Sequence, residues 1–398
     1  MLIVVHDAMA HPCQVQLSRQ LARRGHDVVH QFCGGYATAR GPVGRLADDP
    51  DSFRVEEVAP RSPFARYSPL TRIRQEIVYG LAAARALIGH RPDAIVLSNV
   101  PLVALTIVVT ALRLRRMRYV LWLQDVHSVA ISSVASRRLG AAGKPVAWLA
   151  ERLERRAAHR AAAVIAISEV FRARLDAWGI AYSRVTVIPN WAPIDLMPVH
   201  PRDNAWRTNQ PVATDRSWVL YTGTLGLKHD PSIIVEAAAA MADTQFVVVS
   251  EGRGRVWLEE QKARQGLQNL TLLDYQPYEL LPEVLGSADV LLALLERDAS
   301  EYSVPSKVLN YLCAARPVLA VMPPANLVAQ TVADCGAGYV VDPAQRAHVV
   351  SRLRALLDDA RMREEMGRNG REYAERTFCI DDIGAKFERI LHEQASVG

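Results

Sequence analysis

Short runs of apolar and β-branched residues alternate with helical patterns along this chain, and the alternation occurs twice. In the first half, strands are predicted at residues 2–5, 28–32, 95–98, 119–123 and 163–167. In the second half, they are predicted at residues 218–222, 246–250, 271–274, 290–294 and 318–321. Because strand–helix alternation builds a parallel sheet covered by helices, the chain is predicted to have an α/β fold.

A break separates the two alternating halves. Residues 187–193 read Val-Ile-Pro-Asn-Trp-Ala-Pro, and a polar, proline-bearing stretch follows at 198–217. A length of 398 residues also favours two domains, because a typical domain has about 100–200 residues. The prediction is two Rossmann-like domains, 1–190 and 191–398, which face each other across a cleft. The last helix, after Phe378, is a candidate to fold back on the first domain.

Cysteine usage and apolar runs predict a cytoplasmic protein. The five cysteines are scattered without any Cys-x-x-Cys spacing, which favours a reducing compartment and no structural zinc. Met1 leads directly into an apolar strand, not into a signal peptide. The apolar run at 100–112 is shorter than the roughly 18–20 residues that span a bilayer.

Charge is distributed unevenly. Residues 1–190 contain 26 Lys and Arg against 14 Asp and Glu, whereas the remaining residues contain 21 against 28. The first domain is therefore the one expected to meet an anionic partner, and a membrane surface at the inner face of the membrane is the predicted one. The candidate contacts are Arg113, Arg115, Arg116, Arg118, Arg152, Arg155, Arg156 and Arg160. An ordinary solvated helix face is the alternative interpretation, and nucleic acid is disfavoured because aromatic residues do not interleave with the arginines.

Two glycine-containing loops follow strands of the second half. The first runs from Gly223 through Thr224 to Lys228, and the second from Ser250 to Gly254. A loop of this kind at a strand's carboxyl end lets backbone N–H groups approach an anion, and Lys228 adds a positive charge. One such loop is commonly mere loop geometry, but two in corresponding positions predict a phosphate or nucleotide site.

A third feature is the helix start Pro305-Ser306-Lys307. Proline suits a first helical turn, serine satisfies free N–H groups, and Lys307 places a cation where the helix dipole favours phosphate. An ordinary capped helix with a surface lysine explains the same three residues when they are taken alone.

The motifs together resemble a known family. In order they are residues 187–191, 223–228, 250–252, 266–270, 287–290, 305–307 and 316–320, with 24–28 and 166–168 in the first half. This set is similar to the family 4 retaining glycosyltransferases of GT-B fold, and in particular to the branch that builds bacterial surface polysaccharides, including fucosamine and colanic-acid transferases. The resemblance covers nearly the whole chain.

The resemblance implies a site for a nucleotide-diphosphate sugar in the second domain. The diphosphate is expected against Gly223, Thr224, Lys228, Pro305, Ser306 and Lys307, and Asn310 is expected to bond a ribose hydroxyl. The base is expected near Glu251, Gly252, Arg253, Tyr275 and Gln276. No metal and no cofactor are expected, because cationic side chains neutralise the diphosphate in this family.

Two positions depart from the family pattern. Thr224 stands where typical members have an arginine, which removes one strong phosphate donor. Typical members also carry two glutamates with seven residues between them, and those positions here are Tyr302 and Asn310. Glu301, one residue from the first of them, is the candidate replacement, and it joins Lys228 among the expected catalytic residues.

In the first domain, the sequence Gln124-Asp125-Val126-His127 leaves a predicted strand. Asp125 or His127 is expected to bond sugar hydroxyls or to stabilise charge on the acceptor hydroxyl and the leaving group. A buried, backbone-bonded His127 is an equally good interpretation. His6 and His11, which flank the end of the first strand, are further candidates for acceptor contact.

The resemblance implies a retaining transferase, and the leading hypothesis is that it moves an acetamido or deoxy sugar from a UDP-sugar to a lipid-linked saccharide. A nucleotide-sugar epimerase of the same architecture is one alternative, because it would use the same phosphate site without an acceptor. A nucleotide-sugar-binding protein with impaired catalysis is the other, given Thr224, Tyr302 and Asn310.

Overall fold

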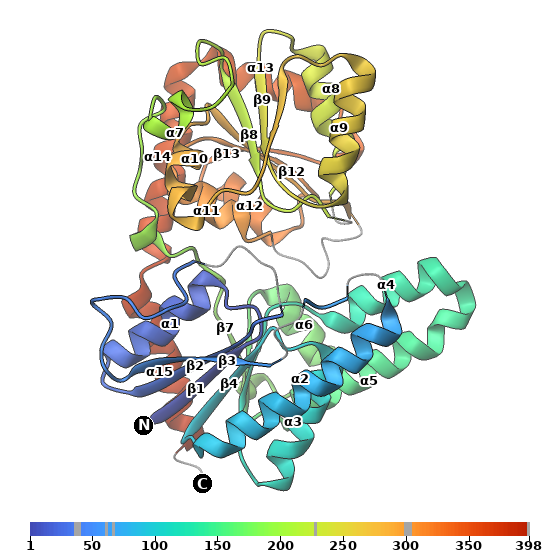
Figure 1. The fold of residues 1–398 in the computed structure, drawn as a ribbon, viewed down its shortest axis with the longest axis vertical. Coiled ribbons are helices and arrows are strands. Elements are labelled where there is room, and N and C mark those ends of the chain that lie inside the picture. The colour runs from blue at the N-terminus through green and yellow to red at the C-terminus, as the bar shows by residue number, and fades with distance from the viewer. Residues whose placement is uncertain (36–40, 60–62, 66–67, 227–228, 298–304, 396–398) are drawn as a thin grey trace. The chain divides into compact units, whose positions relative to one another are not determined.

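The computed structural model describes residues 1–35, 41–59, 63–65, 68–226, 229–297 and 305–395, and Figure 1 shows their arrangement. The chain forms two compact units. The first comprises Met1–Asn190 together with Ile380–Gly398, and the second comprises Trp191–Cys379. Each unit contains one parallel sheet with helices around it, so the predicted α/β class is confirmed.

The sheet of the first unit has the strand order β3-β2-β1-β4-β5-β6-β7, with parallel pairing throughout the described strands. Its strands are β1 (Leu2–Asp7), β2 (Asp27–Cys33), β3 (Phe53–Val58), β4 (Ala94–Ser98), β5 (Val120–Leu123), β6 (Ala163–Ala166) and β7 (Val185–Val187). The helices are α1 (Pro12–Arg23), α2 (Pro69–His90), α3 (Leu102–Leu114), α4 (His127–Leu139), α5 (Lys144–Arg160), α6 (Glu169–Ala177) and α15 (Ile380–Ala395).

The strand order reverses direction at β1. This strand pairs with β2 on one side, where Val4 lies opposite Val29, and with β4 on the other, where Val4 lies opposite Ile95. All three side chains are buried, as expected of central strands in a sheet that helices cover. In open α/β sheets, ligands bind beyond the carboxyl ends of the strands at such a reversal, which here places the ends of β1 and β4 at the favoured position.

The sheet of the second unit repeats this order as β10-β9-β8-β11-β12-β13, again with parallel pairing among the described strands. Its strands are β8 (Trp218–Thr222), β9 (Gln245–Val249), β10 (Leu270–Leu273), β11 (Val290–Leu294), β12 (Val318–Val321) and β13 (Gly338–Val341). The helices are α7 (Ala205–Thr208), α8 (Ser232–Ala240), α9 (Arg253–Gln265), α10 (Leu281–Gly286), α11 (Lys307–Cys313), α12 (Leu327–Asp334), α13 (His348–Asp358) and α14 (Ala360–Thr377). The reversal therefore lies between β8 and β11.

Helix α15 closes the chain within the first unit. Its Phe387 side chain is fully buried against the indole of Trp122 on β5, with the ring centroids 4.7 Å apart. At Gly384 the helix approaches α1 so closely that a Cβ atom there would lie 2.8 Å from Cγ of Gln20. Glu388 accepts hydrogen bonds from Arg24 and shares one with His26, both near the end of α1. The C-terminal helix is therefore part of the first unit's core and not an appendage.

The structure adds three strands to those that the sequence predicts. They are β3, β7 and β13, and each lies at or next to an edge of its sheet. Residues 187–193, read from the sequence as a break, overlap the end of β7. Among the described residues, no helix combines the length and the apolar character that crossing a membrane requires.

Candidate active site

Two glycine loops meet at the carboxyl ends of β8 and β9, next to the strand reversal of the second sheet. After β8, Gly223 adopts φ +119°, a conformation that side chains disfavour, and its N–H donates to the carbonyl of Val249 at 3.1 Å. Leu225 is fully buried, and its N–H donates to the carbonyl of Glu251 at 3.1 Å. The loop after β8 is thus held by the loop after β9.

The second loop, after β9, donates hydrogen bonds back to the first loop. Gly252 has φ +98°, and Gly254 donates its N–H to the carbonyl of Leu225 at 3.0 Å. A Cβ atom on Gly254 would lie 2.7 Å from Cβ of Leu225, which leaves no room for a side chain. Ser250 also donates its hydroxyl to the carbonyl of Gly223 at 2.7 Å. The glycines are therefore required where the two loops interlock.

The interlocking changes the role expected of the first loop. The N–H groups of Gly223 and Leu225 are used inside the protein, and the N–H of Gly226 donates to Nδ1 of His229 at 3.2 Å. These three N–H groups already have acceptors within the protein and are not available to bind an anion in this structure. In the described part of the site, a side chain rather than these three N–H groups brings positive charge.

Lys307 supplies that charge. Its Nζ lies 3.9 Å from the ring centroid of Tyr221 and donates a hydrogen bond to the Tyr221 hydroxyl. A Cβ atom on Gly223 would lie 2.9 Å from this Nζ, so the amine sits directly against the glycine loop. Burial lowers the pKa of Lys307 to about 7, because the charged form loses its hydration. Lys307 is only partly exposed and lies beside a glycine loop, where a bound anion would stabilise its charged form.

The other residues at the start of α11 contribute less than the sequence predicts. Pro305 is buried and precedes the helix. Ser306 is exposed, and within the described residues its side chain makes no capping hydrogen bond, contrary to the expected N–H partner. Asn310 is partly exposed on the first turn of α11. Lys228, Glu301 and Tyr302 lie outside the described residues.

Tyr275 and Gln276 follow β10, the strand beside β9. The hydroxyl of Tyr275 bonds the hydroxyl of Thr224 at 2.8 Å, so Tyr275 joins the first glycine loop. Gln276 accepts a hydrogen bond from the indole N–H of Trp206 at 3.1 Å, and its expected contact with the base stays a prediction. Glu251 and Gly252 are partly exposed, and Arg253 is exposed at the start of α9. The predicted residues Gly223, Thr224, Gly252, Tyr275 and Lys307 are thus brought to one edge of the second sheet.

In the first unit, His127 begins α4 and a buried glutamate holds it. Glu154 on α5 accepts hydrogen bonds from the backbone N–H of His127 at 2.8 Å and of Ser128 at 2.9 Å. The side chain of Glu154 is only 2% exposed and that of His127 is 29% exposed. A carboxylate at a helix N-terminus is stabilised by the helix dipole. Glu154 therefore fixes the start of α4 while the His127 ring keeps access to solvent.

Asp125 and Gln124 lie in the same loop and are partly exposed. The Gln124 side chain exchanges two amide hydrogen bonds with Asn190, of 3.0 and 2.6 Å. Asn99, Asp125, His127 and Glu154 are among the residues that line a small cavity of about 20 Å³ beyond β4 and β5. Such a cavity has room for about one water molecule.

His6 does not meet the expectation of acceptor contact. It is fully buried, with Nδ1 bonded to Gln31 at 3.1 Å and Nε2 to the Tyr79 hydroxyl at 2.8 Å. Burial lowers its pKa to about 4, so the ring is neutral near pH 7. The sequence showed a histidine at a strand end but not that α2 covers it. His11 is partly exposed just before α1, and its N–H donates to Asp7 at 2.7 Å.

Sequence reasoning missed a polar group at the reversal of the first sheet. Asp7 ends β1 and is fully buried. It accepts a hydrogen bond of 2.9 Å from Asn99, the residue directly after β4. Asn99 also bonds Gln14 at 3.0 Å and has φ +54°. Burial raises the pKa of Asp7, although His11 and Asn99 oppose the shift. Polar residues at the ends of both strands that flank a reversal were the available signal.

Comparison with known proteins places both halves in one group of enzymes. Residues 10–191 match the model of the glycosyl transferase 4-like domain, and residues 203–373 match that of the glycosyl transferases group 1. A curated relative, WcaI of Escherichia coli, is named as a colanic acid biosynthesis glycosyl transferase and is 28% identical over 283 residues. That match covers 68% of this chain and 66% of the relative, which is just under two thirds of its length.

Solved structures show the same fold over the whole chain. Sucrose-phosphate synthase from Thermosynechococcus elongatus has a TM-score of 0.74 at 16% identity, and both chains are covered completely. HepE from Anabaena in complex with UDP-glucose has a TM-score of 0.72 at 18% identity, with 99% of this chain and 100% of HepE covered. The two matched domains show that the chain belongs to the family 4 glycosyltransferases, and these solved structures show its GT-B fold.

Proposed function

We propose that this protein is a metal-independent, retaining transferase that moves a sugar from a UDP-sugar to a lipid-linked saccharide during surface polysaccharide synthesis. The observation that carries the donor half is Lys307, whose half-buried amine lies against the Gly223 loop and has a lowered pKa. A diphosphate next to that amine would restore the charge that burial disfavours. Acetamido and deoxy sugars remain the proposed donors.

The comparisons support UDP as the nucleotide and surface polysaccharide synthesis as the class of pathway. HepE was solved with UDP, with UDP-glucose, and with UDP and glucose, so a related fold holds this nucleotide. The name of WcaI supports a role in surface polysaccharide synthesis. The lipid-linked acceptor is the choice that suits such a pathway at a membrane.

The proposed reaction breaks the bond from the sugar's anomeric carbon to the UDP oxygen. The acceptor oxygen bonds the same face of that carbon, and its proton passes to an oxygen of the departing UDP. Lys307 would stabilise the negative charge that grows on the diphosphate. Asp125 and His127 in the first unit would bond the sugar or the acceptor hydroxyl and so orient it. No metal is assigned to this reaction, because Lys307 would carry the compensating positive charge.

For the membrane, we infer an electrostatic contact through the arginines of α3 and α5. The two basic segments come together in the fold because α3 packs against α5. Burial, Arg156 and Arg113 together lower the pKa of Arg160. Each basic residue near an anionic surface contributes about 1 kcal/mol. The protein would then act in the cytoplasm, at the inner face of the membrane, without a spanning segment.

The proposed function is tested by sugar transfer to lipid. The protein is incubated with labelled UDP-sugars and lipid-linked saccharides, and label in the organic phase is measured. Transfer supports the proposal. Incubation with donor alone separates the alternatives: interconversion of the sugars indicates an epimerase, and UDP binding without transfer to any acceptor indicates a binding protein.

Affinity for the UDP-sugar is expected to fall as pH rises above about 7. Lys307 is protonated below its pKa, and the diphosphate favours that charged form, whereas at higher pH binding must first add a proton. For one linked proton the affinity drops by up to about tenfold per pH unit. Calorimetry of a UDP-sugar between pH 6 and 9 measures the slope. A flat profile, or one that rises with pH, would contradict the role of Lys307, and Lys307→Met should flatten it.

Removal of Asp125 or His127 is expected to lower turnover without weakening UDP binding. Asp125→Ala and His127→Ala each remove a polar group of the first unit, whereas the UDP contacts are assigned to the second. Turnover should fall by about tenfold, the scale of one lost hydrogen bond. Steady-state rates and UDP calorimetry on the same samples check both halves. A comparable loss of UDP affinity would show that the division between the units is wrong.

A further inference from the structure

Helices α4 and α5 form an antiparallel hairpin that projects from the first unit (Figure 1). A short 3₁₀ turn at Gly140–Gly143 joins them, and the buried Gly143 packs so closely that a Cβ atom there would lie 2.6 Å from the carbonyl oxygen of Ala135. The two helices are therefore held together near the turn. We call the end of the hairpin around residues 134–149 the hairpin tip.

Apolar side chains gather at the hairpin tip and face solvent. Trp148 is 61% exposed, Leu139 54% and Leu149 49%. Val134 and Val146 are exposed to a similar degree. Large side chains of this kind are normally scattered singly over a protein surface, so their concentration on one projection marks an interaction surface.

The hairpin is also strongly basic. No acidic residue occurs from 126 to 150, and the segment 126–160 contains seven Lys and Arg residues against two Glu. Because Glu154 is buried at the start of α4, it contributes little charge to the outer surface. The exposed face is therefore both apolar and cationic.

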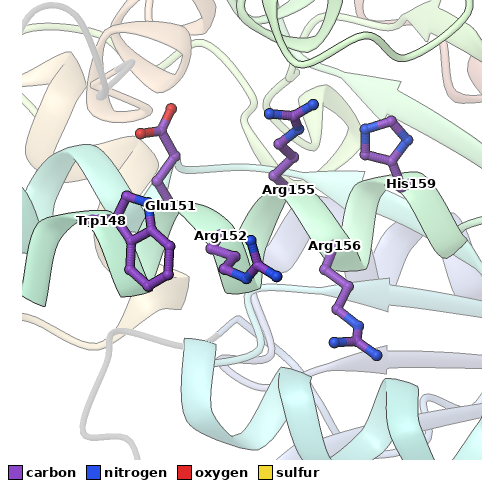
Figure 2. A pocket seen from close by; sticks show the side chains of 6 residues that line it. All are labelled: Trp148, Glu151, Arg152, Arg155, Arg156 and His159. Atoms are coloured by element: carbon purple, nitrogen blue, oxygen red, sulfur yellow. The ribbon is translucent and has the colours of Figure 1, made fainter. Parts of the chain in front are cut away.

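Along α5, the exposed Trp148 and the arginines occupy successive parts of the helix, as Figure 2 shows. In the sequence of α5, Val146 and Leu149 lie with Trp148 toward the turn. Arg152, Arg155 and Arg156 lie farther along the helix from Trp148. Trp148, Glu151, the three arginines and His159 line an open pocket of about 600 Å³. The guanidinium of Arg152 stands 5.4 Å from the ring centroid of Trp148, at the junction of the apolar and basic parts.

We propose that the hairpin tip inserts into the interfacial layer of an anionic lipid bilayer while the α5 arginines bind lipid phosphates. From Trp148 to Arg156 the helix rises about 12 Å, at 1.5 Å per residue. Interfacial segments bury apolar groups about 5–10 Å deep, so arginines one to two turns farther along lie at headgroup level. Tryptophan favours this interface, and Arg137, Arg138 and Lys144 near the turn extend their charges to the headgroups.

The charge of the hairpin favours a lipid bilayer over a second copy of this chain as the partner of the hairpin tip. Two copies that met tip to tip would bring the basic side chains of both hairpins together, whereas an anionic bilayer neutralises them. The proposal deepens the membrane part of the proposed function and rests on it. It adds an apolar contribution that salt does not screen.

Liposome sedimentation of the full chain tests the insertion. Vesicles of phosphatidylcholine, with and without phosphatidylglycerol, are used at low and high salt. The double variant Trp148→Ala/Leu149→Ala is compared with the control Val199→Ala/Val256→Ala, whose residues are 49% and 54% exposed in the second unit. The wild type and the control should keep part of their binding to anionic vesicles at high salt. The tip variant should partition about tenfold more weakly under those conditions.

Two outcomes would overturn the proposal. One is equal binding of the tip variant and the control at high salt. The other is a concentration-dependent dimer in analytical ultracentrifugation without vesicles that the tip variant abolishes, because the tip would then contact a second copy. UDP affinity, measured without vesicles, shows separately whether the donor half of the proposed function holds, since no residue of the hairpin tip is assigned to UDP.

Discussion

Replacement of Lys307 by methionine is expected to weaken UDP binding by about 1–3 kcal/mol, or roughly 5- to 150-fold, the range for losing a charged hydrogen-bond partner. The Lys307 amine lies over Tyr221 and against Gly223, so a neutral side chain at this position removes positive charge directly beside the glycine loop. Methionine fills a similar volume without charge. Isothermal calorimetry with UDP measures the loss.

A matched control is Lys262→Met in the last turn of α9, which should leave UDP affinity unchanged. The unliganded Lys307→Met protein should be at least as stable as the wild type, because burial lowers the pKa of Lys307 and thus disfavours its charged form. A weaker affinity together with an unchanged melting temperature would therefore report binding and not unfolding. Equal UDP affinity in both variants would remove Lys307 from the site.

Replacement of Phe387 by alanine is expected to destabilise the first unit by about 3–5 kcal/mol, the usual cost of truncating a buried aromatic side chain. Phe387 is fully buried against Trp122 on β5, although it lies near the end of the chain. Its loss leaves a cavity between α15 and the sheet. Urea denaturation with peptide-resolved hydrogen exchange locates the effect, since α15 and β5 should exchange faster while β8 of the second unit serves as the reference.

The exposed neighbour Lys386 supplies the control for this prediction. Lys386→Ala should change stability by no more than about 0.5 kcal/mol, as surface substitutions usually do. If Phe387→Ala left the exchange of β5 unchanged, α15 would not be part of the first unit's core in solution.

The central strands of both sheets were predictable because their signal is local. β8, β11 and β12 occupy the residues that the sequence indicates, and β1 and β4 differ only at their ends. These strands are buried on both faces and so read as continuous apolar runs. The strand β3 was missed because its sequence, Phe-Arg-Val-Glu-Glu-Val, belongs to an edge strand with polar side chains.

The site residues likewise divide into those with a local sequence signal and those that tertiary packing determines. Lys307 and the glycines at 223, 252 and 254 were recognisable because their roles follow from residue type and from position after a strand. The partners of the site residues are distant in sequence and were not recognisable. The ring of Tyr221 lies beneath Lys307, and Glu154, 27 positions away, accepts a hydrogen bond from the backbone N–H of His127. Tertiary packing alone brings such pairs together. The same packing buried His6, which the sequence had placed among the acceptor contacts.

The central claim is that the second unit holds a UDP-sugar without a metal. A thermal-shift series with UDP, ADP, GDP and a panel of UDP-sugars, all in the presence of EDTA, tests it most directly, because a ligand that binds the folded state raises its apparent stability. UDP and at least one UDP-sugar should raise the melting temperature in EDTA, and Lys307→Met should abolish or reduce the shift. A series in which no uridine nucleotide stabilises the protein, or in which stabilisation needs an added divalent cation, would contradict the claim.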